Sequence, residues 1–444
     1  MLRAIQHPAR LVPLAFLIAI GVGTALMMLP ISRADPGHAP FVTALFTATS
    51  AVCVTGLTVV DTPTYWSGFG HAMITSLTQI GGYGIMTAAI LLTLVISNRL
   101  GIRTRLLAQA EGRSLGLANV RQVLVRVAVT MLACEAVIAV VLAARFWFAY
   151  DYGFFMSLWY GVFHAVSSFN NAGFSLFSDS LAGFVGDWWI CVPITVGVIT
   201  GSVGFPVLFE LAREIRRPST WSTHTRLTVV GSLALLLIGF LVMLTFEWTN
   251  PNTLGPLGVE EKVLASFTQG SMPRSGGFSS VDYGVMNMET SAVVIALMFI
   301  GGGSASTAGG IKLTTFLLLA FVIWAEIKGE QDVVIGRRRI AEGVQRQALA
   351  VALLGVALVA SGTLALIATG GSVALQQALF EVTSAFATVG LSTGITPTLP
   401  ATAHVVLIIL MFVGRVGTIT VAAALALRSR RRLYRYPEER PIVG

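Results

Sequence analysis

One short pattern occurs four times along the chain and constrains its fold more than any other feature. In each copy a Phe is followed four residues later by Ser, and six residues after that by a Gly-[Leu/Phe]-[Ser/Thr] triplet. The copies are Phe46–Ser50–Gly56-Leu57-Thr58, Phe163–Ser167–Gly173-Phe174-Ser175, Phe267–Ser271–Gly277-Phe278-Ser279 and Phe380–Ser384–Gly390-Leu391-Ser392. Because internal repeats reflect a repeated structural unit, we expect four similar units in tandem, one in each quarter of the chain.

The composition is that of a membrane protein. Hydrophobic residues make up 55% of the 444 residues and charged residues only 11%, whereas soluble domains carry about 25% charged residues. The net charge of +8 would suggest nucleic-acid binding in a soluble protein, but its distribution argues against a nucleic-acid partner. The cysteines Cys53, Cys134 and Cys191 lie in apolar stretches without metal-ligand spacing, so we expect buried thiols.

Basic clusters alternate along the chain with loops that carry acidic residues. The basic residues lie in five clusters, at 3–10, 99–126, 213–226, 328–346 and 428–440. The alternate loops between them have few cations and carry the acidic residues Asp35, Asp61, Asp151, Asp179, Asp187, Glu247, Glu260, Glu261 and Asp282. By the positive-inside rule all five clusters, and with them both termini, lie in the cytoplasm, which predicts eight spanning helices, two in each quarter.

Each quarter has the same order of segments: a spanning helix, a half-length apolar helix, a glycine loop and a second spanning helix. The predicted spanning pairs are 11–29 with 66–97, 123–148 with 188–211, 227–246 with 291–327, and 348–369 with 404–427. The half-length segments, shorter than the about 20 residues that cross a bilayer, are 41–54, 154–169, 259–272 and 373–387. The sequence thus predicts an all-α integral membrane protein with four membrane–pore–membrane repeats around one pore. The repeats are 1–98, 122–217, 218–330 and 331–444, with a cytoplasmic loop at 99–121 and a short cytoplasmic C-terminus.

A second glycine cluster follows each repeat glycine, in the middle of the second spanning helix. Three of the clusters are short, at 81–84, 201–204 and 414–417, and small residues there indicate close helix packing. The third quarter instead has ten consecutive small residues at 301–310, five of them glycine. Such a run cannot form a stable helix, and non-helical backbone at membrane depth must be buried in protein or line water. We therefore expect the third inner helix to be broken over 301–310.

The four glycine loops have the chemistry of a cation filter. Glycine reaches backbone dihedrals that turn successive carbonyls the same way, and the preceding half-helix directs its partially negative end at the loop. Neither Asp nor Glu occurs within three residues of the four glycines, so carbonyl oxygens suit a large monovalent ion. The fourth copy, Thr388-Val389-Gly390, matches the Thr-Val-Gly start of the potassium-channel filter. Tight turns between helices are the alternative, which four copies in register disfavour.

With these loops the chain resembles the Trk/Ktr/HKT superfamily of cation transporters over essentially its whole length. The closest local matches are three segments: Thr49 to Leu57, Phe169-Asn170-Asn171-Ala172-Gly173-Phe174, and Pro273-Arg274-Ser275-Gly276-Gly277-Phe278. Eight spans without a further N-terminal pair resemble the bacterial KtrB-like branch. The resemblance implies potassium uptake across the bacterial cytoplasmic membrane through filter carbonyls. These come from Val54, Thr55, Gly56, Asn171, Ala172, Gly173, Ser275, Gly276, Gly277, Thr388, Val389 and Gly390.

The ion preference follows from the same resemblance. Members with Ser for the first filter glycine tend to favour sodium, and here all four positions are Gly, so potassium is expected. A sodium-selective or non-selective member of the same fold is the alternative, and dependence of potassium uptake on sodium is also implied. The third filter reads Ser-Gly-Gly where Thr-Ala-Gly is commoner, and we expect little change because the carbonyls bind the ion.

A gate below the filter is the next implication. Arg415 lies midway along the last predicted helix, where a lone charge is costly, so we expect it to face the pore or to bond a glycine-loop carbonyl. The resemblance makes it an electrostatic barrier and makes the broken segment an intramembrane gating loop, with Lys312 either holding that loop or facing the cytoplasm. The predicted gate residues are Gly301, Gly302, Gly303, Ser304, Ala305, Ser306, Thr307, Ala308, Gly309, Gly310, Lys312 and Arg415.

Four other polar residues within the apolar segments receive supporting roles. We expect Glu135 to make a structural hydrogen bond, and His164 and Asn170 to support the second filter. Glu381 either stabilises the fourth filter or its outer mouth, or serves as a capping or packing carboxylate. The sequence shows no cluster of nucleophile, base or metal ligands within the spans, which disfavours a membrane-embedded enzyme.

The predicted partners also follow from the resemblance. It implies a homodimer, each protomer with its own pore, and a KtrA/TrkA-like cytosolic ring that binds ATP or ADP. The basic stretches 98–121 and 326–346 are either the docking surface for that ring or a surface facing lipid headgroups. A secondary transporter with alternating access is the other mechanistic class, but it predicts inverted repeats, whereas these four run in the same direction.

Overall fold

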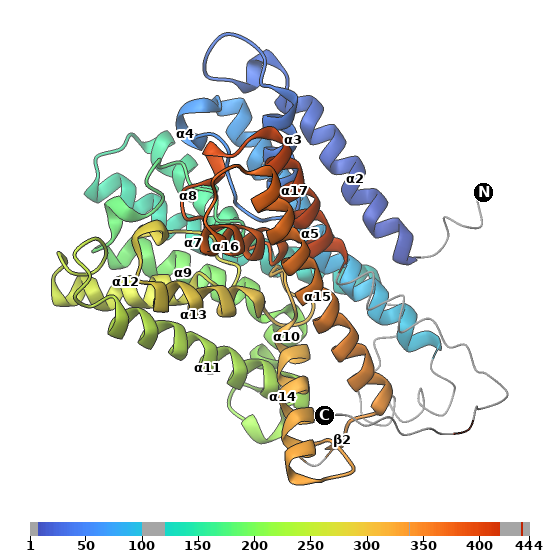
Figure 1. Cartoon of the computed structure of the whole chain (residues 1–444). Coiled ribbons are helices and arrows are strands. Elements are labelled where there is room, and N and C mark those ends of the chain that lie inside the picture. Colours follow the sequence, from blue (N-terminus) through green and yellow to red (C-terminus); the bar gives the residue numbers. More distant parts are fainter. Residues whose placement is uncertain (1–7, 100–119, 337, 418–436, 438–444) are drawn as a thin grey trace, which may run out of the picture.

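The computed structural model is mostly helical and describes residues 8–99, 120–336, 338–417 and 437 (Figure 1). The chain repeats one order of elements: a long helix, a half-length helix, a loop and an inner helix. The long helices are α2 (Pro8–Met27), α7 (Val120–Ala149), α11 (Thr223–Phe246) and α15 (Glu342–Thr369). The half-length helices are α3 (Phe41–Val52), α8 (Phe154–Phe169), α12 (Val259–Ser271) and α16 (Leu375–Phe386). The inner helices begin with α5 (Gly68–Arg99), α9 (Trp188–Val203), α13 (Met288–Phe299) and α17 (Ala401–Phe412).

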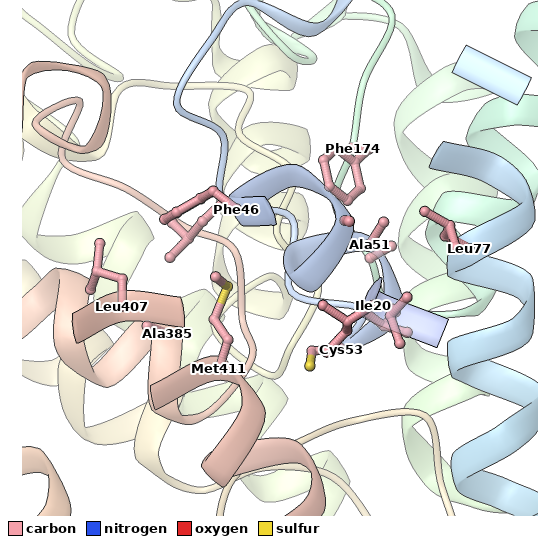
Figure 2. Close-up of a cluster of buried hydrophobic side chains, with 14 of the residues drawn as sticks. Ile20, Phe46, Ala51, Cys53, Leu77, Phe174, Ala385, Leu407 and Met411 are labelled. Atoms are coloured by element: carbon pink, nitrogen blue, oxygen red, sulfur yellow. The ribbon is translucent and has the colours of Figure 1, made fainter. Parts of the chain in front are cut away.

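These four groups of helices pack in a ring. Within a group the long helix contacts both its half-length helix and its inner helix. Between groups, each inner helix packs on the half-length helix of the next group: α5 on α8, α9 on α12 and α13 on α16. The last inner helix, α17, packs on α3 and closes the ring (Figure 1). Figure 2 shows this closing contact, where Leu407 and Met411 of α17 share one buried cluster with Phe46 of α3.

The three short glycine clusters fit α5, α9 and α17 against the end of their own half-length helices. A Cβ added at Gly81 would collide with the carbonyl oxygen of Val52, the last residue of α3. Equivalent collisions join Gly201 to the carbonyl of Phe169, and Gly414 to that of Phe386. The inner helices therefore approach the half-length helices more closely than any residue with a side chain would permit.

Two of the inner helices depart from a straight helix. In the third group α13 ends at Phe299 and α14 (Leu313–Lys328) begins only after an irregular segment. In the second group the predicted continuous helix over 188–211 is wrong, because α9 and α10 (Phe205–Glu214) meet at a bend of 103°. The bend lies at Gly204, whose φ of +98° leaves helical geometry and which Pro206 follows. Close packing alone does not account for this glycine cluster.

The last inner helix changes its winding at its end. A π-helix, Val413–Gly417, follows α17 directly and carries Arg415. A π-helix has more residues per turn than an α-helix and commonly occurs at functional sites. The remainder of the predicted span, up to residue 427, lies outside the described residues, as does most of the predicted loop 99–121.

Length and apolarity single out α7, α11 and α15 as helices able to cross a membrane, with the bent α9–α10 pair as a fourth, among the described residues. Shorter apolar helices include α2, α3, α13 and α17.

Outside the helices, strands β1 (Val334–Ile335) and β2 (Arg338–Arg339) form a two-residue antiparallel hairpin beside α14 (Figure 1). This hairpin is a minor correction to the all-α prediction.

Replacing Gly81 by Ala tests the close packing of the inner helices. The added methyl group collides with a backbone carbonyl, so we expect the variant to lose about 1–3 kcal/mol of unfolding free energy, measured by chemical denaturation in detergent micelles. Gly21→Ala is the matched control, since nothing lies within 4 Å of its added Cβ. Equal stabilities of the two variants would contradict this packing.

Candidate functional site

The four glycine loops share one backbone conformation. The first residue of each predicted filter triplet has a positive φ: Val54 at 55°, Asn171 at 62°, Ser275 at 70° and Thr388 at 48°. The repeat glycine two residues later is also positive: Gly56 at 93°, Gly173 at 72°, Gly277 at 73° and Gly390 at 91°. The middle residue of each triplet is not among the residues with positive φ. Alternation of left-handed and ordinary dihedrals turns successive carbonyls toward one side of the strand, as a filter requires.

The repeat serines anchor these loops, but in only three of the four groups. In the first, the backbone carbonyl of Ser50 accepts from the Thr55 N–H at 2.7 Å, and its Oγ accepts from the Gly56 N–H at 3.0 Å. The fourth group repeats both bonds at 2.8 and 3.1 Å with Ser384. The second repeats the carbonyl bond at 2.7 Å with Ser167, whose hydroxyl donates to the Phe174 carbonyl instead.

The third loop is held differently from the other three, whereas the expectation that its altered triplet changes ion binding little stays a prediction. Its Ser271 hydroxyl donates to the Phe267 carbonyl of its own helix at 2.7 Å. The Gly276 N–H donates to Met272 instead of the repeat serine. Arg274, 2% exposed, donates to the carbonyl and the hydroxyl of Ser232 in α11, at 3.2 Å each. Sequence reasoning missed this residue, although a lone arginine one position before a filter triplet was visible in the sequence.

The four glycines meet around one axis. A Cβ on Gly56 would collide with the Ala172 carbonyl, and one on Gly390 with that of Thr55. A Cβ on Gly173 would lie 2.5 Å from the Cα of Gly277, so successive loops are in backbone contact. All four glycines line one cavity of about 270 Å³, whose rim carries the carboxylates of Asp61 and Asp282. The four loops thus meet at one cavity, and two carboxylate residues belong to the same lining.

The irregular segment between α13 and α14, residues 300–312, lies against the inner ends of these loops. The Thr307 hydroxyl donates to the Asn171 side chain at 2.9 Å, and the Gly309 N–H donates to the Ser275 hydroxyl at 3.4 Å. The segment also bonds the bend between α9 and α10, because the Gly303 N–H donates to the Ser202 carbonyl at 2.8 Å. It is therefore packed, buried backbone that contacts two groups besides its own.

Two cations donate hydrogen bonds to backbone carbonyls of this segment, one of them from within the segment itself. Arg415, 2% exposed, donates from Nη1 to the carbonyl of Thr307, which is the glycine-loop partner anticipated from the sequence. Lys312 donates from Nζ to the Ala308 carbonyl at 2.6 Å, so in this conformation it holds the segment. Among the described residues neither cation forms an ion pair with a carboxylate.

The residue after the repeat phenylalanine tethers the outer side of two loops. Glu381 is fully buried and accepts hydrogen bonds from Ser392, Thr393 and Thr396 at 2.7 to 3.1 Å. The equivalent His164 in the second group lies 3.2 Å from the Ser175 hydroxyl. Since Ser392 and Ser175 are each two residues past their filter glycine, Glu381 stabilises the outer end of the fourth loop.

The second loop also has a buried polar support behind it. The Glu135 carboxylate accepts from Gln79 and from Asn170, both at 2.9 Å, and Asn170 also donates to Gln79 at 2.9 Å. Asn170 is the C-cap of α8, immediately before Asn171. Glu135 therefore makes the structural hydrogen bond expected of it, and Gln79 completes a three-residue network that the sequence did not reveal.

The fold and these loops define a multi-pass membrane protein of the cation-transport class. A family model described as TrkH, "Cation transport protein", matches residues 14–432. The chain belongs to this family, which confirms the resemblance drawn from the four loops, and the family is one of transporters and not of enzymes.

Curated relatives match over nearly their full length. The chain is 39% identical to the Ktr system potassium uptake protein B of Bacillus subtilis, covering 98% of this chain and 97% of that protein. The protein of the same name from Vibrio alginolyticus is 34% identical, over 98% and 94%. The potassium/sodium uptake protein NtpJ of Enterococcus hirae is 33% identical, over 98% and 97%. The crystal structure of the potassium transporter TrkH from Vibrio parahaemolyticus matches with a TM-score of 0.73 at 20% identity, over 94% of this chain and 84% of that one, which shows a shared fold.

Glu381→Ala tests the tether of the fourth loop. Removing the carboxylate leaves buried donors without their acceptor, so we expect the unfolding free energy in detergent to fall by about 2–4 kcal/mol. Glu289→Ala, at an exposed position at the start of α13, is the control and should change it by less than about 1 kcal/mol. Similar losses in both variants would show that Glu381 stabilises nothing specific.

Proposed function

We propose that the chain conducts potassium ions into the cell through a filter formed by its four glycine loops. The observation that carries this proposal is that all four repeat glycines line one cavity and share the left-handed conformation. Potassium is a large monovalent ion that is cheap to dehydrate, and a set of carbonyls can replace its water shell. Relatives named as potassium uptake proteins support this choice of ion.

In this proposal the chain crosses the bacterial cytoplasmic membrane eight times with both termini inside. The repeats are 1–98, 122–217, 218–330 and 331–444, as the sequence predicts, and the half-length helices re-enter the membrane from outside. Their C-terminal ends, at Val52, Phe169, Ser271 and Phe386, aim partial negative charge at the filter. The positive-inside pattern supports this orientation.

Sodium remains the rival ion. Glycine at all four filter positions supports potassium, whereas one relative is named a potassium/sodium uptake protein. Carbonyls alone discriminate the two ions by their number and field strength, so a sodium-selective or non-selective member of the same fold would share this geometry. Dependence of potassium uptake on sodium is part of the same proposal.

The segment 301–310 is the proposed gate. It lies directly against the inner ends of the second and third loops, so an ion that leaves the filter meets it first. Arg415 and Lys312 hold it through carbonyls and place positive charge there, which opposes the passage of cations. Opening requires the segment to move away from the filter.

A regulatory ring and a second copy of the chain complete the proposed assembly. Relatives carry the name of component B of a Ktr system, which supports a separate regulatory component that binds ATP or ADP. Arg338 and Arg339 on the β1–β2 hairpin are exposed and belong to the stretch 326–346, which we propose as its contact surface. The hairpin follows α14 in the chain, and α14 begins at Leu313, three positions after the end of the gate segment. In this proposal, a movement of the hairpin is transmitted through α14 to the gate. The second copy forms a homodimer in which each protomer has its own pore.

Gly390→Asp tests the filter. The added side chain collides with the Thr55 carbonyl and places a carboxylate among the filter oxygens. We expect potassium flux through the purified protein in liposomes to fall at least about 100-fold, equivalent to about 3 kcal/mol.

Gly371→Asp is the matched control for this experiment. Gly371 also has a positive φ, of 79°, but nothing lies within 4 Å of an added Cβ, so its flux should match the wild type. Replacing potassium by sodium in the same liposomes should reduce the wild-type flux. Undiminished potassium flux through Gly390→Asp would rule out this filter.

Shortening the segment Gly302 to Ala308 tests the gate. With the obstruction removed, we expect potassium flux in the absence of any partner to rise about tenfold or more. Combining the shortened segment with Gly390→Asp must return the flux to background, which shows that the ions still pass the filter. Reduced or unchanged flux in the shortened protein would argue against a gate at this position.

A further inference from the structure

The gate segment contacts the first residue of three filter triplets. Thr307 bonds the Asn171 side chain, and the Gly309 N–H bonds the Ser275 hydroxyl. Gly309 also packs on Thr388 so closely that an added Cβ would collide with its Oγ1. The gate and the innermost turn of the filter are thus in direct contact.

Ser275 extends this contact into the filter itself. Its hydroxyl accepts from the Gly309 N–H at 3.4 Å and donates to the Thr388 carbonyl at 2.7 Å. The Thr388 carbonyl is one of the oxygens proposed to bind potassium. The Ser275 hydroxyl uses its proton on the Thr388 carbonyl and one lone pair on the Gly309 N–H. Neither the Ser275 hydroxyl oxygen nor the Thr388 carbonyl oxygen is therefore fully free to bind a cation.

The third glycine loop is also the one best able to respond when the gate segment moves. It lacks the serine anchor that fixes the first and fourth loops, because the Ser271 hydroxyl bonds its own helix. Ser275 nevertheless keeps a positive φ of 70°, a conformation that persists in a non-glycine residue only where its surroundings hold it. In this conformation the Ser275 hydroxyl has the Gly309 N–H and the Thr388 carbonyl as its partners.

We propose that Ser275 is a positioning residue that couples the gate to the inner end of the filter. With the loop seated, its hydroxyl is committed to Gly309 and Thr388, and potassium binds the inner end weakly. When the loop withdraws, the hydroxyl rotates and both oxygens become available to the ion. The inference rests on the proposed filter and adds to it a residue that sets potassium affinity according to the state of the gate.

The experiment is a double-mutant cycle read by potassium binding to the purified full-length protein, titrated calorimetrically in detergent. In the wild-type background, shortening Gly302 to Ala308 should tighten potassium binding about two- to tenfold, the change expected for one neutral hydrogen bond. In the Ser275→Ala background the same shortening should have no effect, and Ser275→Thr, which keeps the hydroxyl, should restore it. Ser271→Ala is the matched control: it removes a buried hydroxyl from the preceding helix and should preserve the response.

Lys312→Met serves as a second way to loosen the loop should the shortened protein not fold. It removes the bond to the Ala308 carbonyl without touching the filter and should tighten binding in the same direction. A response to the loop that persists in Ser275→Ala, or no response in the wild-type background, would overturn the coupling. These outcomes differ from failure of the filter itself, in which Gly390→Asp would bind potassium as well as the wild type.

Discussion

The close backbone contact between the four glycine loops is the constraint on which the rest of this molecule depends. Each loop must turn left-handed twice within three residues and come into contact with its neighbours, and at the second turn only glycine avoids a collision. The half-length helices deliver the loops to the centre, and the glycines of the inner helices let those helices close beneath them. The contact of each inner helix with the next half-length helix then holds four loops from distant parts of the chain in one register.

Departures from this fourfold plan concentrate in the third group. Its inner helix is interrupted, its repeat serine bonds its own helix, and Arg274 ties its filter triplet to α11 instead. All three differences lie in or next to the third glycine loop, which the gate segment contacts through Ser275. In the proposed mechanism, the loop without the serine anchor is the one that can follow the gate segment, while the serine anchors hold the other three loops in place.

Local sequence patterns predicted the features that depend on local backbone chemistry. The half-length helices, the glycine triplets and the interruption near 301–310 follow from length, glycine content and the repeat itself. The bend at Gly204 was missed because its glycine cluster resembles the other two short clusters, and Pro206 two residues later was the signal that distinguished it. The partners of Arg274 and Arg415 could not be predicted individually, since their hydrogen bonds join residues 42 and 108 positions apart and arise only when the ring closes.

Arg415 bonds a backbone carbonyl and not a carboxylate, and this difference suits a buried charge that holds the proposed gate segment. Breaking a buried ion pair by removing one partner costs about 3–5 kcal/mol, whereas a single hydrogen bond from a charged donor contributes about 1.5–3 kcal/mol. Arg415 bonds the Thr307 carbonyl, so withdrawal of the segment leaves no carboxylate stranded. The same bond keeps the positive charge beneath the filter while the gate is seated. In the proposed mechanism, the carbonyl partner combines a barrier to cations with a bond that the proposed regulatory subunit can break.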